Sequence, residues 1–255
     1  MKSQLVRMFG FPATLIHGDT LVLDRWLWLK QNLPPIRDGS KRLLDVGCGS
    51  GAFTIGAARR GYRALGLSWD ERNQKVARER AFICKAPLAE FQVQDVRHLD
   101  QRVDLKERFE IVVCCENIEH ILSDHKLMVD MERCLKPGGT LLLTTPNLNY
   151  KPMTRSDLGP FSQIEDGGHV RKGYTSEDLN NLCDSGGLKV LHIGYCSGFI
   201  SQRLTAFMRK PSAIHPLLGW GVVLPLRALP PVLDCWISKV IGWPGYSITL
   251  VATKC

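Results

Sequence analysis

The chain has 255 residues, 44% of them hydrophobic and 23% charged, and its formal net charge is +8. This composition is typical of one globular α/β domain with additions, long enough to bury a core. The cations form no run interleaved with aromatic residues, so nucleic acid is disfavoured as a partner, while a membrane surface or an anionic ligand is not.

The nine cysteines show no C-x-x-C pair and no Cys/His metal spacing. We therefore expect reduced thiols, a cytoplasmic protein and no metal site. The N-terminus lacks the apolar core of a signal peptide. The longest uncharged run, 211–226, contains three prolines, so we expect no spanning helix, although contact with a membrane surface remains open.

The first predicted element is a helix in the N-terminal region. Apolar residues recur at helical spacing from Val22 to Leu33, Asp19 or Thr20 precedes them as a cap, and prolines follow.

The stretch LLDVGCGSG, 43–51, is the most informative part of the chain. A short apolar run ends at Asp45, and Gly47, Gly49 and Gly51 follow before a predicted helix at 53–60. Glycines in such a turn allow positive φ and close approach of a ligand to the backbone. The spacing G-x-G-x-G differs from the G-x-G-x-x-G of a dinucleotide site. A glycine-rich turn without any ligand is the alternative.

This motif resembles the first motif of the class I S-adenosylmethionine-dependent methyltransferases. The resemblance implies a doubly wound sheet of six parallel strands and an antiparallel seventh. It also implies S-adenosylmethionine as cofactor, S-adenosylhomocysteine as product, and Asp45, Gly47, Cys48, Gly49 and Gly51 in the cofactor site. The N-terminal helix would be a lid over the sites, or else a simple cover for the sheet edge.

The second predicted strand, 62–67, departs from the family pattern at its end. An acid that holds the cofactor ribose is expected at Ser68, but the acid comes two residues later, at Asp70, after Trp69. Either Ser68 takes one hydroxyl and Asp70 reaches round, or Asp70 caps the following helix. We include all three residues in the predicted cofactor site.

A third strand at 90–93 is followed by Asp95 and Val96. By resemblance, Asp95 accepts the adenine amino group and the Val96 backbone amide meets the ring. A loop residue or helix cap is the alternative interpretation of Asp95.

The fourth strand begins at Phe109 and leads into Glu116-Asn117-Ile118-Glu119-His120. The segment resembles the fourth motif of small-molecule methyltransferases, quinone-biosynthesis O-methyltransferases among them. It lacks the Asn/Asp-Pro-Pro-Tyr of amino-group methylases, which disfavours DNA methylation. We assign Glu116 to the cofactor, Asn117 to the substrate, and His120 to proton transfer or substrate hydrogen bonding. A purely structural histidine is the alternative.

A helix at 127–135, a Lys-Pro-Gly-Gly breaker and a fifth strand at 140–145 come next. The long polar loop 146–175 is of the kind that carries function. By resemblance it folds over the substrate, so Asn147 and Tyr174 are candidate substrate contacts and His169 is a second candidate base. A capped helix at 175–184 closes this part.

Strands at 188–195 and 247–253 enclose a segment rich in Leu, Trp, Pro and scattered cations. Such a segment suits a membrane-lying element or a lipidic substrate tunnel, whereas a packed helical subdomain, with a homodimer as one use, is the alternative. We expect an N-terminal helical lid at 1–36, a cofactor-binding core at 37–198, the apolar insert at 199–244 and the last strand at 245–255.

Together these features predict transfer of the sulfonium methyl group by SN2 displacement to a small molecule, at a hydroxyl of a hydrophobic metabolite. Three alternatives stay open: a carbon or nitrogen acceptor on a lipid, isoprenoid or quinone at the membrane surface, a cofactor-binding protein without catalysis, and a nicotinamide oxidoreductase. The glycine spacing speaks against the last. The expected location is the cytoplasm, or peripherally the inner membrane surface.

Overall fold

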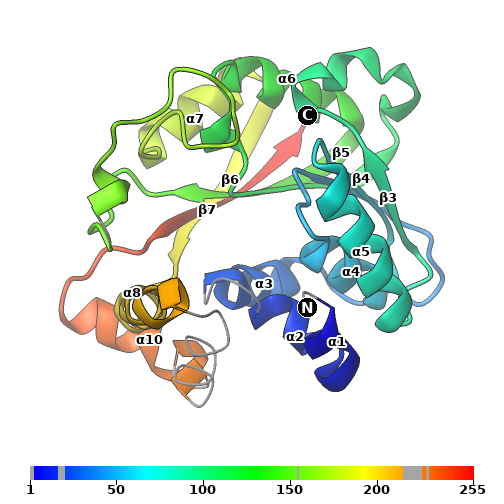
Figure 1. The fold of residues 1–255 in the computed structure, drawn as a ribbon. Coiled ribbons are helices and arrows are strands. Elements are labelled where there is room, and N and C mark those ends of the chain that lie inside the picture. Colours follow the sequence, from blue (N-terminus) through cyan, green and yellow to red (C-terminus); the bar gives the residue numbers. More distant parts are fainter. Residues whose placement is uncertain (1–2, 17–20, 154, 215–225, 228–229) are drawn as a thin grey trace.

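The structure is a computed structural model that describes residues 3–16, 21–153, 155–214, 226–227 and 230–255. At its centre lies a seven-stranded sheet in the order β3-β2-β1-β4-β5-β7-β6 (Figure 1). The strands are β1 (Arg42–Val46), β2 (Arg63–Ser68), β3 (Ala89–Val93), β4 (Phe109–Cys115), β5 (Leu135–Pro146), β6 (Leu188–Cys196) and β7 (Ser247–Lys254). Only β7 runs antiparallel to its neighbours in the sheet. The predicted sheet of six parallel strands and an antiparallel seventh is confirmed.

Helices cover both faces of this sheet, with α6 and α7 above it in Figure 1 and α3, α4 and α5 below. The described helices are α1 (Gln4–Phe9), α2 (Pro12–Ile16), α3 (Leu21–Asn32), α4 (Ala52–Arg59), α5 (Glu71–Ile83), α6 (Asp124–Cys134), α7 (Ser176–Ser185), α8 (Phe199–Ile214) and α10 (Pro230–Val240). Short 3₁₀ turns occur at η1 (Val96–Gln101), η2 (Val103–Leu105), η3 (Ile118–His120) and η4 (Arg155–Leu158).

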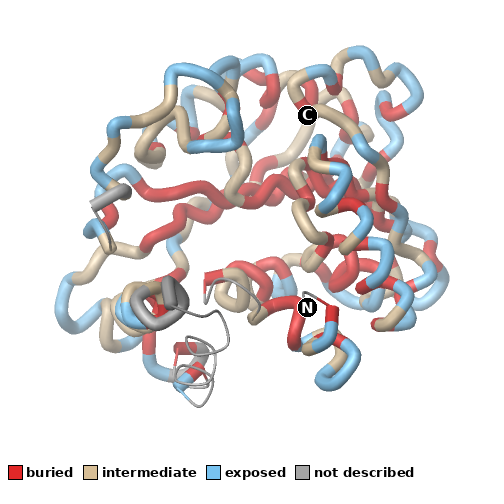
Figure 2. Tube along the Cα trace, in the orientation of Figure 1, coloured by how far each residue is buried: buried red, intermediate tan, exposed pale blue. Residues whose placement is uncertain are grey.

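The central strands are buried on both faces, as Figure 2 shows. Successive residues of a strand point to opposite faces, so Leu43 and Val113 join the core under α4 and α5, while Leu44 and Val112 join the core under α6 and α7. Because both faces are buried, the sequences of these strands are nearly continuous apolar runs.

Local signals place the helix ends where the sequence predicts them. Asp70 caps α5, since its Oδ1 accepts from the backbone N–H of Arg72 at 2.8 Å and of Asn73 at 3.3 Å. Thr175 and Asp178 form a reciprocal capping box at the start of α7. The capping interpretation of Asp70 is therefore confirmed.

The Lys-Pro-Gly-Gly segment, predicted to end before the fifth strand begins, lies within that strand in the structure. Strand β5 starts at Leu135, directly after α6, and Leu135 pairs with Phe109 while Thr140 pairs with Ile111. The Lys-Pro-Gly-Gly segment is thus an irregular excursion within the strand. Full burial of Leu135 explains why pairing begins before the breaker rather than after it.

The segment between β6 and β7 forms α8 and α10, which pack on each other and on α3 (Figure 1). The apolar positions of this insert at 217–224 and 229 lie outside the described residues. Across the described parts of the chain, no helix has both the length and the apolar character needed to span a bilayer. All nine cysteines are free, and most are buried, as expected.

Candidate active site

A cleft of about 390 Å³ opens where β1, β2, β3 and β4 end. Residues that directly follow each of these parallel strands line it, which is the usual place for a ligand in a doubly wound sheet. The predicted cofactor residues on its wall are Gly47, Gly49, Ser68, Trp69, Asp70, Asp95, Val96 and Glu116. The wall also contains Asn117, His120 and several residues that the sequence did not single out, namely Asn73, Arg97, Ile121, Glu165, Asp166 and Gly167.

Three predicted cofactor residues, Asp45, Cys48 and Gly51, belong to the turn behind this wall. Asp45 is 1% exposed and accepts from Thr54 Oγ1 at 2.6 Å, and burial raises the pKa of Asp45 to about 6. A Cβ on Gly51 would lie 2.7 Å from the Phe91 ring. The contacts of Asp45 and Gly51 thus shape the glycine turn, and the assignment of these three residues to the cofactor stays a prediction.

The turn itself forms a cradle for a ligand. A Cβ on Gly47 would lie 2.3 Å from the Asn117 side chain, whereas a Cβ on Gly49, at φ +51°, would meet no atom within 4 Å. Gly49 therefore faces open space in the cleft. Asn117 Nδ2 is buried without a hydrogen-bond partner among the described residues. A cradle with an unpartnered donor fits a polar ligand such as the nucleoside cofactor that the first motif implies.

Asp95 meets an arginine that the sequence analysis did not identify. Arg97 Nε donates to both Asp95 carboxylate oxygens at 2.9 Å, and Arg97 also pairs with Glu165 at 3.0 Å. The Arg97 guanidinium holds the pKa of the Asp95 carboxyl below its usual value. Asp95 is thus ionised, and the same arginine ties the cleft to the loop that carries Glu165.

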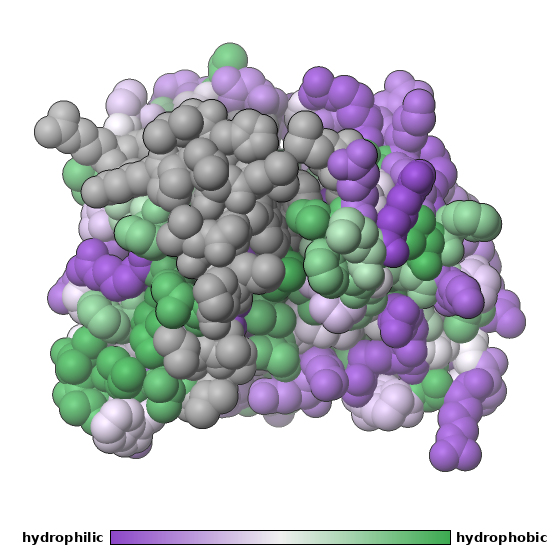
Figure 3. All heavy atoms as spheres, turned by 60° about the horizontal axis from the view of Figure 1, so that its bottom comes forward, coloured by the Kyte–Doolittle hydropathy of each residue, from purple (hydrophilic) through white to green (hydrophobic). Residues whose placement is uncertain are grey.

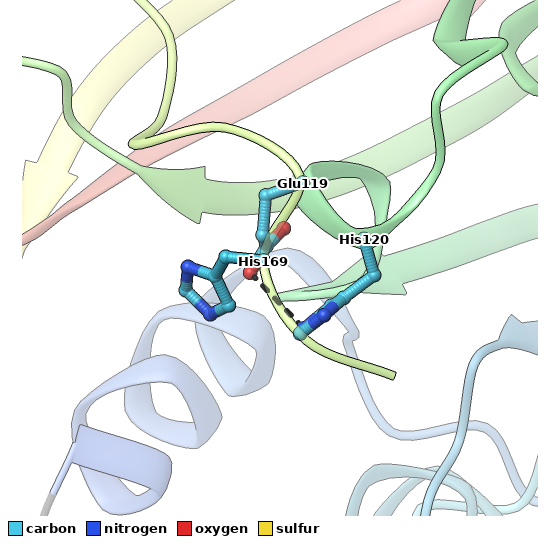
Figure 4. Close-up of side chains that lie close together, drawn as sticks. All are labelled: Glu119, His120 and His169. Atoms are coloured by element: carbon cyan, nitrogen blue, oxygen red, sulfur yellow. Dashed lines mark ion pairs between the residues drawn. The ribbon is translucent and has the colours of Figure 1, made fainter. Parts of the chain in front are cut away.

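His120 and His169 meet at the side of the cleft, their rings perpendicular and 4.6 Å apart between centroids (Figure 4). His120 Nδ1 lies 3.0 Å from the carbonyl oxygen of Gly168. Because a carbonyl only accepts, Nδ1 carries the proton and Nε2 keeps its lone pair. The loop that carries His169 is also held by a hydrogen bond from the Val170 N–H to the Glu119 carbonyl.

Burial, and then the nearby His120, lower the pKa of His169 to about 4. His169 is therefore neutral near pH 7 and a weak base. Of the two predicted bases, the geometry and this pKa favour His120 for proton transfer.

Glu119 completes this group. Its side chain is fully buried, Thr145 Oγ1 donates to it at 3.1 Å, and its Oε1 lies 4.0 Å from His120 Nε2. Burial, and then the neighbouring Glu116, raise the pKa of Glu119 well above its usual value.

Potential ligand atoms of Glu119, His120 and His169 lie within 4.8 Å of one another. The sequence shows no metal-ligand spacing because His169 is far along the chain from the other two. The three side chains thus form a group of possible metal ligands that the spacing in the sequence does not indicate.

A second cavity, of about 580 Å³, adjoins the cleft. It is lined by Tyr150, Asp157, Pro160, Phe161, Ser162, Asp166, Gly168, His169, Arg209 and Tyr246. Asp166 lines both spaces, and His120 lines the cleft while His169 lines the cavity. The histidine pair thus stands at the boundary between the two.

The predicted substrate contacts Asn147 and Tyr174 lie elsewhere. Asn147 Nδ2 donates to the Gly245 carbonyl at 3.0 Å, and the Tyr174 hydroxyl donates to Asp124 at 2.9 Å. Both residues are 5% exposed, face each other across a β-bridge and line neither space. They belong to the scaffold of the loop, which corrects the prediction.

The N-terminal helix α3 contributes Arg25 to the site. Arg25 lies 3.0 Å from Glu116 Oε2, and Ser247 Oγ donates to Glu116 Oε1 at 2.9 Å. Arg25 also lies 5.9 Å from the centre of the Tyr246 ring in the second cavity. Of the two interpretations of this helix, the contacts of Arg25 favour a lid that takes part in the site.

Replacing Arg25 with glutamine should lower the free energy of unfolding by about 3–5 kcal/mol, because it leaves Glu116 buried without its cation. The side chains of this pair are only 8% and 16% exposed. The matched control is Arg7→Gln, which breaks an Arg–Glu pair whose side chains are 66% and 41% exposed and should leave stability unchanged. Urea denaturation measures both variants, and equal midpoints would contradict the prediction.

A family model for methyltransferase domains matches residues 23–193, which span α3 and the sheet from β1 into β6. The chain belongs to the class I S-adenosylmethionine-dependent methyltransferases. The cofactor of this methyltransferase is therefore S-adenosylmethionine, and the cleft with its glycine cradle is where the residues fit it.

Among its relatives, this methyltransferase is similar to the ubiquinone biosynthesis O-methyltransferase of Coxiella burnetii, 29% identical over 157 residues. That match covers 60% of this chain and 65% of the relative, less than two thirds of its length.

Two solved structures share the fold. Phosphoethanolamine N-methyltransferase 2 of Haemonchus contortus, in complex with S-adenosylmethionine, has a TM-score of 0.64 at 18% identity, covering 90% of this chain and 52% of that one. Geranyl diphosphate C-methyltransferase of Streptomyces coelicolor, with Mg²⁺, geranyl diphosphate and S-adenosylhomocysteine, has a TM-score of 0.58 at 16% identity, covering 91% and 77%. By their names, these two proteins of the same fold are a nitrogen and a carbon methyltransferase.

Proposed function

We propose that this methyltransferase moves the cofactor methyl group to a hydroxyl of a hydrophobic small molecule held in the second cavity. The observation that carries the proposal is the His120–His169 pair at the boundary between the cofactor cleft and that cavity. A base with a free lone pair at this boundary would be placed to take the proton of an acceptor hydroxyl that reaches from the cavity toward the cofactor cleft.

The residues of the cleft bind and orient the cofactor, which supplies an electrophilic methyl group when bound. Gly49 leaves room for it, and Gly47 leaves room for the Asn117 side chain, which offers its unpartnered N–H. Asp95 and Val96 would meet the adenine. Ser68, with Asp70 beside it, lies where the ribose hydroxyls are expected.

His120 Nε2 takes the proton of the acceptor hydroxyl as its oxygen forms the new bond to carbon. When bound, S-adenosylmethionine would supply the methyl group, keep the electron pair of the broken carbon–sulfur bond on sulfur and leave as S-adenosylhomocysteine. The Tyr150 and Tyr246 rings, 4.7 Å apart between centroids, offer an apolar wall for the acceptor.

The test uses S-adenosylmethionine labelled with carbon-13 in the methyl group and a panel of hydrophobic phenols, amines and activated carbon acids. We expect label on phenolic oxygen, which the chemical shift of the methyl carbon identifies. Transfer to nitrogen or carbon alone would replace the hydroxyl proposal with the second candidate. Binding of S-adenosylhomocysteine without transfer to any acceptor would favour a protein that binds the cofactor and does not catalyse.

The proposed chemistry uses no metal ion. Chelation tests this, because Glu119, His120 and His169 form a group that could hold one. Dialysis against a chelator should leave kcat unchanged, because a protonated Nδ1 and a free Nε2 suffice for proton transfer. Loss of activity on chelation, restored by one divalent ion and not by others, would contradict this.

We propose a cytoplasmic enzyme that acts on a small molecule and not on nucleic acid. A homodimer through the insert between β6 and β7 is the alternative to membrane contact for this segment. Light scattering on the purified protein tests it directly, since a monomer at micromolar concentration would contradict a stable homodimer.

A further inference from the structure

Helix α10 presents apolar side chains to solvent on one face. Leu233, Trp236 and Val240 are 38%, 66% and 66% exposed, and their spacing places them on the same side of the helix. Ile241, just beyond the helix, is 50% exposed. Figure 3 shows hydrophobic side chains gathered at the left of this end of the molecule, where α8 and α10 lie in Figure 1. We call Leu233, Trp236, Val240 and Ile241 the α10 face.

The segment that carries this face has an excess of cations in its sequence. Residues 203–255 contain six Lys or Arg (Arg203, Arg209, Lys210, Arg227, Lys239, Lys254) and a single acid, Asp234. Of these cations, Arg227 is buried, Arg209 pairs with Asp157, and Lys254 pairs with Glu107 and Glu132. Asp234 is 6% exposed, and its carboxylate accepts from the backbone N–H groups of Gly198 and Ile200 at the start of α8. Asp234 thus holds the start of α8 inside the insert and is not presented to solvent, while Arg203 and Lys239 are exposed.

Cations and aromatic rings alternate beside the face. The Arg203 guanidinium lies 4.7 Å from the centre of the Trp243 ring and 5.5 Å from that of Phe199. Lys151 Nζ lies 4.0 Å from the Trp243 ring on the loop after β5. An apolar helix face bordered by cations and tryptophan is the arrangement that binds an anionic bilayer surface.

We propose that the α10 face docks on a bilayer that contains anionic lipid, with α10 lying in the plane of the headgroups. The charge complementarity selects this occupant over a second copy of the chain, because two cationic faces repel each other. The proposal deepens the proposed function: α8 packs on α10 and carries Arg209 to the second cavity, so a docked enzyme meets a hydrophobic acceptor at the surface that dissolves it.

The test is sedimentation of the full chain with vesicles of phosphatidylcholine alone, or of phosphatidylcholine and phosphatidylglycerol in equal parts. We expect binding to the mixed vesicles only, weakened by added salt because salt screens exposed charges. Trp236→Asp and Val240→Asp should each weaken binding by roughly tenfold or more, since each buries a charge in place of an apolar side chain. Lys239→Glu should weaken it by at least about fivefold.

The matched control is Phe82→Asp, because Phe82 is 86% exposed on α5, away from the insert. It should leave vesicle binding unchanged. Absence of wild-type binding, equal binding to both vesicle types, or an equal loss in the Phe82 variant would each overturn the proposal. A dimer in solution that the Trp236 variant dissolves, without vesicle binding, would overturn it in favour of self-association. Sedimentation does not depend on methyl transfer, so failure of the proposed reaction leaves this result readable.

Discussion

Replacing His120 with glutamine should lower kcat by about 10²–10⁴-fold, the usual contribution of a general base. Glutamine can still donate to the Gly168 carbonyl, which the His120 Nδ1 proton does now at 3.0 Å, so the loop should stay in place. Glutamine has no basic nitrogen that could replace the lone pair of His120 Nε2. The affinity for S-adenosylhomocysteine, measured by calorimetry, should therefore stay within about twofold of the wild type.

The matched variant is His169→Gln, on the other side of the same ring contact. Since the pKa of His169 is lowered to about 4, His169 is a weak base near pH 7. Replacing His169 should therefore lower kcat by less than about tenfold. A larger loss for His169 than for His120 would exchange their roles. Unchanged kcat in both variants would mean that the acceptor enters already ionised and that no general base is used.

Gly49→Val should weaken binding of S-adenosylhomocysteine by on the order of 10- to 100-fold or more, as overfilling a packed space does. Gly49 lines the cofactor cleft at φ +51°, and its added side chain would point into space that no atom of the chain occupies within 4 Å. Calorimetric titration with S-adenosylhomocysteine measures the effect directly. NADH should not bind either protein, because the glycine spacing is not that of a dinucleotide site.

Gly138→Val is the control that distinguishes two causes of weaker binding, a side chain that fills the cleft and a strained backbone. Gly138 has φ +73° and also meets nothing within 4 Å of an added Cβ, but it lies in the excursion of β5, outside the cleft. Both valines carry a similar cost for positive φ. If the two variants lose affinity equally, strain and not occupation of the cleft is the cause, and Gly49 is not part of the cradle.

The sheet and the cleft were predictable because their signals are local. Gly47 and Gly49 follow a strand directly, Asp70 precedes a helix by one residue, and Asp95 follows the next strand. Each of these residues reaches the cleft because the carboxyl ends of parallel strands meet at one edge of a sheet.

The side chains that meet across the fold were not predictable in the same way. Glu119 is adjacent to His120, and helical geometry argues that the two point apart, yet the tight η3 turn brings their side chains within 4.0 Å. In the sequence, nothing distinguishes Arg25 from other cations on an amphipathic helix, and only the packing of α3 brings it to Glu116. Asn147 and Tyr174 show the opposite error, since polar residues in a long loop also serve to hold the loop together.

The carboxylate of Glu116 is held by residues from opposite ends of the chain. Arg25 comes from the first long helix and Ser247 from the last strand, and these two side chains touch across 222 positions of sequence. During synthesis the glycine turn and β4 leave the ribosome well before Ser247 does, so Glu116 gains both partners only when β7 has emerged. A nascent chain that stops before β7 should therefore lack a completed site, which delays methyl transfer until β7 has been made.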